Sequence, residues 1–141
     1  MNYYLGYQIG AIKFATEIHE IKEIIRPKTI IADGKFPKNI AGFCILRNKK
    51  IFIFDLPTFL AIKIARPYEV IVTEVDGLTI GFWAEKIYGI LTATQLLPYP
   101  EIVGIRDYLL GIIKRDGELF QVLSFARILS GTRLRTIRKY L

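Results

Sequence analysis

The residue types that most often carry chemistry are scarce in this chain, which has one cysteine and one histidine among 141 residues. The single cysteine, Cys44, excludes an internal disulfide and is typical of a reducing compartment. His19 stands far from Cys44 in the sequence, so no group of ligands has the spacing of a metal site. The glycines form neither a GxGxxG nor a GxxxxGK(S/T) pattern, and Ser124 and Ser130 have no base nearby. These absences predict a binding module that is not an enzyme and uses no metal or cofactor.

Long apolar runs are also missing. Asp55 and Lys63 interrupt the most apolar region, so no stretch reaches the roughly 18 residues that a membrane span needs. The N-terminus lacks the basic segment and apolar run of a signal peptide. We therefore expect a cytoplasmic protein without direct membrane insertion.

Acidic residues are fewer than basic ones, 13 against 20, which gives a net charge of +7. The excess is spread over both halves of the chain, and residues 127–141 hold five basic residues and no acidic one. Such a charge serves solubility, nucleic-acid binding or an acidic partner surface, and all three remain open. A small basic β-barrel that binds nucleic acid is the alternative function, although no aromatic cluster is interleaved with lysine and arginine.

What the chain does contain is a large share of strand-forming residues, with 52% hydrophobic side chains rich in isoleucine, valine, phenylalanine and tyrosine. Polar or glycine-containing centres separate pairs of apolar runs, a pattern typical of β-hairpins. Hairpins are expected for 3–18 about Gly10, for 40–56 about the polar residues 47–50, and about Asp76-Gly77 and Asp116-Gly117.

The segments between the hairpins predict shorter features. A helical turn is expected within 19–25, a short strand or turn between Pro57 and Pro67, and a loop over 95–104. Residues 124–141 are expected to form a helix. Its apolar face would consist of Leu134, Ile137 and Leu141.

An internal repeat links the two halves. At a spacing of 69, Gly42, Ile51 and Ile53 match Gly111, Phe120 and Val122, and at a spacing of 66, residues 15–25 match 81–91. Two similar small barrels that share a core would leave few free strand edges. Coincidence in an isoleucine-rich chain is the other interpretation.

Three single residues invite either a structural or a functional interpretation. Cys44 lies within an apolar strand and is expected in the core. Trp83 is either a packing residue or an exposed binding anchor. Arg47 falls where a strand should end, with no catalytic partner near it in the sequence.

An ordered set of short motifs runs through the first half of the chain. The stretches are FATEI (14–18), IKEI (21–24), Phe36-Pro37, Gly42, ILRN (45–48) and IFIFDL (51–56). This set resembles the CheW-like domain of bacterial chemotaxis. In that family a strand ending in "YGI" or "YAL" leads to a "V-x-E-I" segment, then to a Pro-marked loop, a glycine, an "N-L-R-G" turn and a "V-I-P-V-V-D-L" strand.

The second half continues the resemblance, which covers nearly the whole chain. The matching stretches are GFWAEKI (81–87), Pro98-Tyr99-Pro100, YLLG (108–111) and ELFQVLSFARIL (118–129). Asn48 replaces the usual glycine of the turn, Phe52 replaces a proline, and Ala84-Glu85 stands where Val-Asp is usual. The connection after residue 60 is shortened.

The resemblance implies an all-β fold of two SH3-like five-stranded β-barrel subdomains on a shared hydrophobic core, with short helical turns and a C-terminal helix. The whole chain, 1–141, would be one CheW-like domain. Its first barrel would span about 10–66, its second 67–130, and its basic C-terminal helix or tail 131–141.

The resemblance further implies a non-enzymatic adaptor that links chemoreceptors to the histidine kinase CheA. Its expected partners are the cytoplasmic tip of a methyl-accepting chemoreceptor and the regulatory domain of CheA, and no nucleic acid is expected. Such a protein would be cytoplasmic and would join membrane receptor arrays through these partners.

The partner-binding residues expected from the resemblance are Ile18, Ile21, Glu23, Gly42 and Arg47. Ile21 would lie in the receptor-binding region with Ile18 as its apolar neighbour, unless both are simply core residues. Glu23 and Arg47 would form an ion pair beside the partner surface, unless the two charges are solvated independently.

Overall fold

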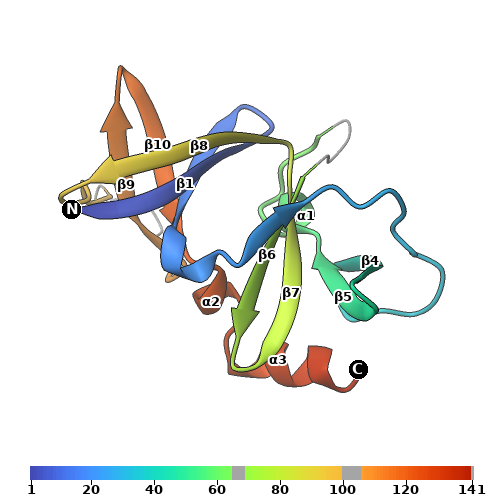
Figure 1. Cartoon of the computed structure of the whole chain (residues 1–141). Helices are drawn as coiled ribbons and strands as arrows, with labels where there is room; N and C mark the ends of the chain where they lie inside the picture. Colours follow the sequence, from blue (N-terminus) through green and yellow to red (C-terminus); the bar gives the residue numbers. More distant parts are fainter. Residues whose placement is uncertain (65–68, 100–105, 141) are drawn as a thin grey trace.

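The structure is a computed structural model, and it describes residues 1–64, 69–99 and 106–140. Its strands form two five-stranded sheets (Figure 1). Sheet A has the order β8-β1-β2-β10-β9, and its strands are β1 (Asn2–Ile9), β2 (Ile12–Glu17), β8 (Lys86–Ala93), β9 (Leu109–Arg115) and β10 (Glu118–Leu123). Sheet B has the order β3-β6-β7-β5-β4, and its strands are β3 (Glu23–Ile25), β4 (Ile40–Leu46), β5 (Lys49–Phe54), β6 (Glu69–Val75) and β7 (Leu78–Ala84).

Short helices connect and close these sheets. They are the 3-10 helix η1 (Ile18–Glu20), α1 (Leu56–Phe59), α2 (Phe125–Ile128) and α3 (Gly131–Arg138). A side chain caps the N-terminus of both α1 and α2. Asp55 accepts a hydrogen bond from the Thr58 amide at 3.2 Å, and Ser124 accepts one from the Arg127 amide at 3.3 Å. Such caps satisfy amide groups that a first helical turn leaves unpaired.

All four expected hairpins form, and each is antiparallel. The polar centre at 47–50 is narrower than expected, because Lys49 and Lys50 already belong to β5. Arg47 therefore occupies the turn itself and does not end a strand.

Four local expectations were wrong or incomplete. Only residues 18–20 of the expected helical turn are helical, because 23–25 pair with β6 as a strand. Helix α1 replaces the strand or turn expected after Pro57. Residues 86–93, for which no strand was expected as a whole, form β8 against β1. The predicted helix over 124–141 divides into two helices, α2 and α3. Three residues named in the predictions, Pro67, Pro100 and Leu141, lie outside the described residues.

The internal repeat is confirmed in detail. Gly42 and Gly111 have φ angles of 154° and 155°, each just inside a hairpin. Beside them, Phe43 bridges to Ile31 and Ile112 bridges to Leu97. Each sheet also contains one parallel strand pair, β5 with β7 in sheet B and β10 with β2 in sheet A. The two sheets therefore have the same order when β8, β1, β2, β10 and β9 are matched to β3, β6, β7, β5 and β4.

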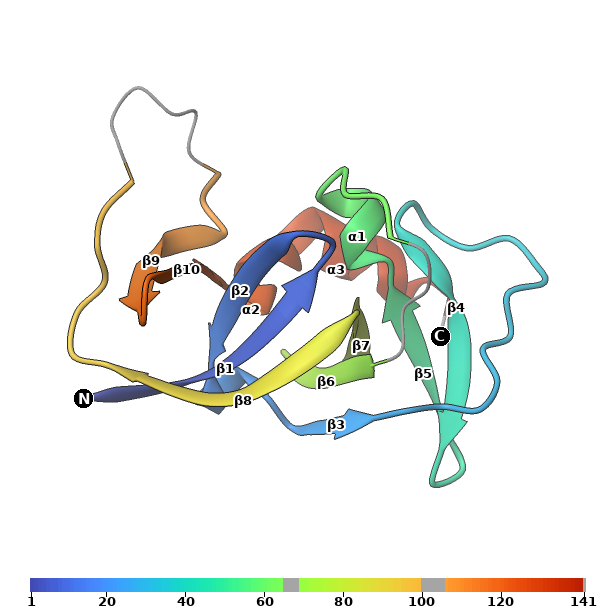
Figure 2. The same cartoon turned by 90° about the horizontal axis from the view of Figure 1, so that it is seen from above.

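The two halves of the chain exchange strands, so the expected barrel boundaries at 10–66 and 67–130 do not coincide with the sheets. The strand after each leading hairpin crosses over, β3 to the edge of sheet B and β8 to the edge of sheet A (Figures 1 and 2). Neither half can complete its sheet alone, which makes their folding interdependent.

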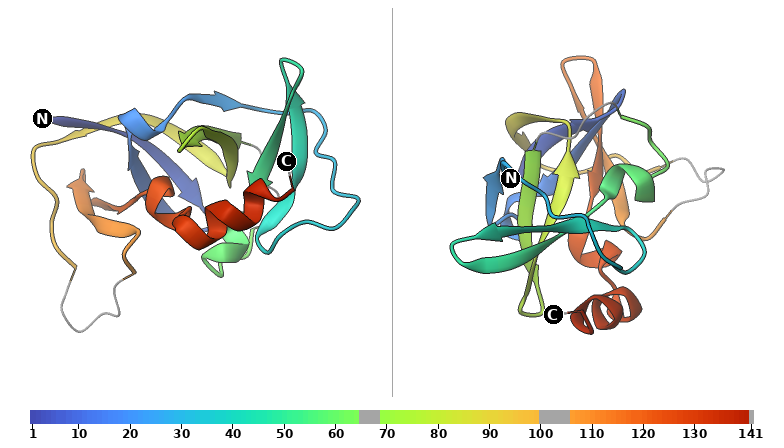
Figure 3. Two further views of the ribbon diagram at one scale, coloured as in Figure 1. Left: turned by 90° about the horizontal axis from the view of Figure 1, so that it is seen from below. Right: turned by 90° about the vertical axis from the view of Figure 1, so that its right-hand side faces the viewer.

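A shared hydrophobic core joins the sheets. It combines Tyr7 and Phe14 of sheet A with Phe54 and Phe82 of sheet B, and Phe125 of α2 stacks on Phe82 at 4.2 Å between ring centroids. Helix α3 lies along the same side as α2 and α1 (Figure 3). The all-β fold with a shared core is thus as the sequence predicted.

Each sheet also has a smaller cluster on its other face. Cys44 is buried in the cluster of sheet B, as expected, and burial raises the pKa of its thiol. Trp83 packs half-buried against the same cluster, which favours its packing interpretation.

Candidate partner-binding site

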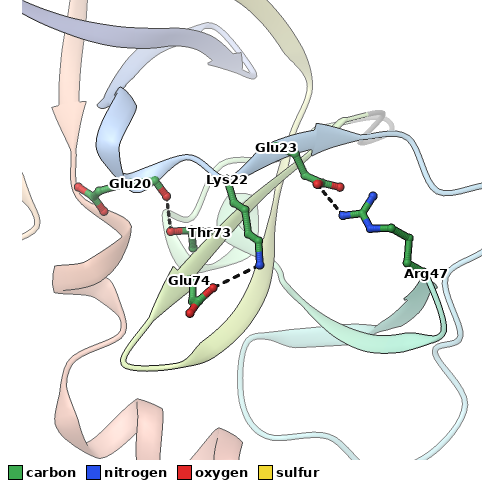
Figure 4. A network of polar contacts seen from close by, with 6 residues as sticks. All are labelled: Glu20, Lys22, Glu23, Arg47, Thr73 and Glu74. Carbon is green, nitrogen blue, oxygen red and sulfur yellow. Dashed lines mark hydrogen bonds and ion pairs between the residues drawn. The ribbon is translucent and has the colours of Figure 1, made fainter.

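The sequence-predicted ion pair is present. Arg47 Nη2 lies 2.6 Å from Glu23 Oε2, and the side chains are 67% and 28% exposed, respectively (Figure 4). The hairpin turn of β4 and β5 supplies the arginine, and the first residue of β3 supplies the acid. The contact therefore connects the edge strand β3 to the β4–β5 turn, and β3 pairs with neither β4 nor β5.

The position of Arg47 is unusual for its residue type. Arg47 and Asn48 have φ angles of 48° and 64°, matching Asp76-Gly77 at 49° and 82° and Asp116-Gly117 at 51° and 80°. A two-residue hairpin turn of type I′ has positive φ at both positions, and Asp-Gly is a preferred pair for it. Arginine rarely adopts this conformation. Turn chemistry alone does not explain an arginine here, which points to the role of its side chain.

Contacts with β6 hold the segment that carries Glu23, on the side away from Arg47. Lys22 Nζ lies 3.3 Å from Glu74 Oε2, and the Lys22 amide donates to the Val72 carbonyl at 2.7 Å. The Thr73 hydroxyl donates to the Glu20 carbonyl (Figure 4). Lys22 and Glu23 thus point to different neighbours, one to β6 and the other to the β4–β5 turn.

A further ion pair at the end of β3 was missed by sequence reasoning. Arg26 donates through Nε to Glu69 Oε1 at 2.7 Å, and its Nη2 contacts the same oxygen. This interaction raises the pKa of Arg26. In the register that pairs Glu23 with Val72, residue 26 falls opposite residue 69. The signal was therefore the register of β3 with β6, which the sequence alone does not reveal.

A groove of about 740 Å³ opens beside the Glu23–Arg47 pair, and we refer to it as the ion-pair groove. Its lining combines basic and apolar side chains with the single acid Glu23. The lining residues are Lys22, Glu23, Leu46, Arg47, Lys49, Lys50, Ile51, Val72, Gly77, Leu78 and Thr79.

The charges of the ion-pair groove are not balanced by its own acids. Lys22 and Arg47 each form an ion pair. Lys49 and Lys50 form none with any residue that the structure describes. The Lys50 ammonium lies 4.4 Å from the ring centroid of Phe43, a cation–π distance. Such a groove suits a partner segment with an apolar side and carboxylates along its edge.

Ile18 is the first residue of η1, and Ile21 directly follows its last residue. Both are half-buried and pack against the shared core, so each also contributes to packing. The Ile21 amide donates to the Ile18 carbonyl at 2.9 Å, and Glu20 Oε1 accepts a hydrogen bond from the Ala126 amide of α2 at 2.9 Å. Ile18, Ile21 and Glu23 thus lie on one continuous segment, which Arg47 contacts from the β4–β5 turn through Glu23. Neither isoleucine is among the residues that line the ion-pair groove.

Gly42 is buried and lies away from the groove lining. A Cβ atom at this position would lie 2.3 Å from the Ile31 carbonyl oxygen. The glycine therefore permits a close backbone approach between β4 and residue 31. Its direct role is structural.

Groups for catalysis do not assemble in the described part of the chain. No cluster of three or more histidine, cysteine or acidic residues there has metal-binding geometry. His19 is exposed, and its Nδ1 lies 2.8 Å from Glu17 Oε2. The helices among the described residues are all too short or too polar to cross a membrane.

The fold and the site define a class of protein: two interleaved five-stranded sheets with a groove beside an exposed ion pair, and no metal-binding cluster among the described residues. The sequence profile of the CheW-like domain matches residues 3–133. The chain belongs to the CheW-like domain family.

Comparison with solved structures supports the same fold. The scaffolding protein TtCheW from Thermoanaerobacter tengcongensis matches with a TM-score of 0.80, at 17% sequence identity, over 94% of each chain. At this identity the likeness concerns the fold. A comparison with curated proteins found no match.

Proposed function

We propose that this protein is a non-enzymatic chemotaxis adaptor that links chemoreceptors to the histidine kinase CheA. Membership of the CheW-like family supports this function. The observation that carries it is the Glu23–Arg47 ion pair at the ion-pair groove. Arg47 occupies a turn position that disfavours arginine, so a contact made by its side chain is the reason for its presence there.

The proposed receptor partner is the cytoplasmic tip of a methyl-accepting chemoreceptor, which is a helical hairpin. An amphipathic helix binds a groove through apolar anchors on one face. Ile21 and its neighbour Ile18 supply such anchors, because both are only half-buried. Glu23 orients the segment that carries them, and Arg47 meets the partner directly.

The proposed kinase partner is the regulatory domain of CheA. The adaptor would be cytoplasmic and would reach membrane receptor arrays only through its partners. Gly42 contributes indirectly, since its close approach to the Ile31 backbone fixes the start of the hairpin that presents Arg47.

A binding experiment with partners from the same genome tests this function. The kinase regulatory domain and a receptor cytoplasmic fragment are immobilised separately, and association of the full chain is measured by interferometry. We expect binding to both, and the chain should make kinase autophosphorylation respond to the receptor fragment. Absence of binding to either partner would contradict the proposal. Lys114→Glu, on the distant β9–β10 hairpin, is the matched charge control and should bind normally.

A further inference from the structure

The C-terminal helix α3 has an anchoring side and an outward side. Leu134 and Ile137 are 7% and 3% exposed and belong to the shared core. Helix α3 is therefore packed on the body of the protein through these two side chains. Its outward side holds Thr132, Arg135, Thr136 and Lys139.

Two arginines flank the apolar side and help to hold α3. Arg133 Nη1 donates to the Ile128 carbonyl at 3.0 Å, and its guanidinium lies 4.9 Å from the Phe59 ring centroid. Arg138 donates to the Asp76 carbonyl on the β6–β7 turn. These backbone carbonyls accept hydrogen bonds from the two arginines but do not neutralise the charges of the guanidinium groups.

The cations of this helix are not paired with carboxylates within the part of the chain that the structure describes. Among the described residues, Arg133, Arg135, Arg138 and Lys139 form no ion pair with a carboxylate. Arg135 and Lys139 are one turn apart, a spacing at which like charges repel. The helix therefore keeps a positive surface that its own stability does not require.

A pocket of about 450 Å³ continues this surface on the Arg133 side. It adds the cation Lys38, and none of its lining residues is acidic. The lining residues are Pro37, Lys38, Asn39, Phe54, Thr58, Phe59, Thr132, Arg133, Thr136 and Ile137. The Thr132 hydroxyl accepts a hydrogen bond from Arg135 Nη2 at 3.3 Å, so its own hydrogen can be donated to a ligand.

We propose that the outward side of α3 and this pocket form a docking surface for an acidic segment of a partner protein. Charge complementarity selects the occupant: Lys38 and Arg133 line a pocket that has no acidic lining residue, and Arg135 and Lys139 are exposed on the adjoining outward side of α3, which suits carboxylate side chains. No residue of α3 lines the ion-pair groove, so this surface is additional to the one proposed for the receptor.

Two other anions fit the surface less well. A helix that inserts into a membrane interface presents its apolar side, whereas Leu134 and Ile137 are buried in the core. Sites for single-stranded nucleic acid combine cations with several stacking aromatic rings. Among described residues 125–140, Tyr140 is the one exposed aromatic side chain.

Binding of a labelled glutamate-rich peptide tests the proposal, with a glutamine-rich peptide of equal length as the neutral comparison. We expect the full chain to bind the glutamate peptide in a salt-sensitive manner. The double variant Arg135→Gln/Lys139→Gln should bind roughly two- to tenfold more weakly, as surface ion pairs allow. Lys38→Gln should also weaken binding and provides an independent variant outside α3.

The matched control is Lys114→Gln/Arg115→Gln, which removes the same charge from the exposed β9–β10 hairpin. It should bind the glutamate peptide as the parent chain does. An equal loss in the control would show that net charge alone attracts the peptide, and would overturn the proposal. Tighter binding to phosphatidylserine vesicles or to single-stranded DNA than to the peptide would also overturn it.

Discussion

Replacing Gly42 by alanine should destabilise the protein strongly, although the substitution adds a single methyl group. Gly42 has a φ of 154°, a region that favours glycine. The added Cβ would lie 2.3 Å from the Ile31 carbonyl oxygen and 3.1 Å from the Ala32 Cα. Backbone atoms cannot move aside as a flexible side chain can, so β4 or the 31–32 segment must shift.

The expected loss follows from two contributions. An unfavourable φ costs about 1–3 kcal/mol, and displacing the bridge between Ile31 and Phe43 removes hydrogen bonds worth about 1 kcal/mol each. We expect the free energy of unfolding to fall by about 3–4 kcal/mol in total. For a chain of this size, such a loss lowers the melting temperature by roughly 10–15 °C.

Thermal and denaturant unfolding followed by circular dichroism measure this loss. Gly77→Ala is the matched control, since Gly77 also has a positive φ but a Cβ there would meet no atom within 4 Å. It should lose only the conformational contribution, about 1 kcal/mol. Equal melting temperatures for the two variants would refute the close approach of β4 to residue 31.

Three further predictions concern the tail, the receptor anchor and the response to pH. Truncation before Thr132 removes Leu134 and Ile137, which contribute about 1.5–3 kcal/mol each, so the melting temperature should fall; an unchanged melt would show a tail that does not pack. Ile21→Ala should weaken receptor binding by more than its loss of stability explains, and a collapse of the fold without separable binding loss would mean a core role only. Burial raises the pKa of Tyr7, so its protonated phenol stabilises the fold fully below the unfolded pKa of about 10, and this contribution is lost as pH rises above it. Chemical denaturation across this range should show a smaller decline for Tyr7→Phe, and identical slopes would contradict the assignment.

Features set by local chemistry were predictable from the sequence. Asp-Gly pairs predicted two hairpin turns, and the spacing of Gly42 and Gly111 revealed the repeat. The burial of Leu134 and Ile137 followed from helical periodicity. The turn and helix signals depend on neighbours in sequence, and the repeat on the likeness of two stretches of sequence, so neither required knowledge of tertiary pairing.

Features set by tertiary pairing were not predictable. β3 and β8 became strands because β6 and β1 offered them unpaired edges, although residues 19–25 also have a helical pattern. The exchange of strands between the halves has no local signature. For this reason the sheets do not follow the expected boundaries.

The candidate site shows the same division. The resemblance predicted the Glu23–Arg47 contact, and the structure confirms its geometry. The Arg26–Glu69 contact depends on the register of β3 with β6 and was missed. The partner-binding role of these residues remains a proposal.

A charge-swap cycle at Glu23 and Arg47 tests the central claim most directly. An exposed ion pair contributes only about 0–1 kcal/mol to stability, so Arg47→Glu should leave the melting temperature nearly unchanged. Its binding to the receptor fragment and to the kinase regulatory domain should weaken, and adding Glu23→Arg should restore part of the loss. Full binding by Arg47→Glu would contradict the account.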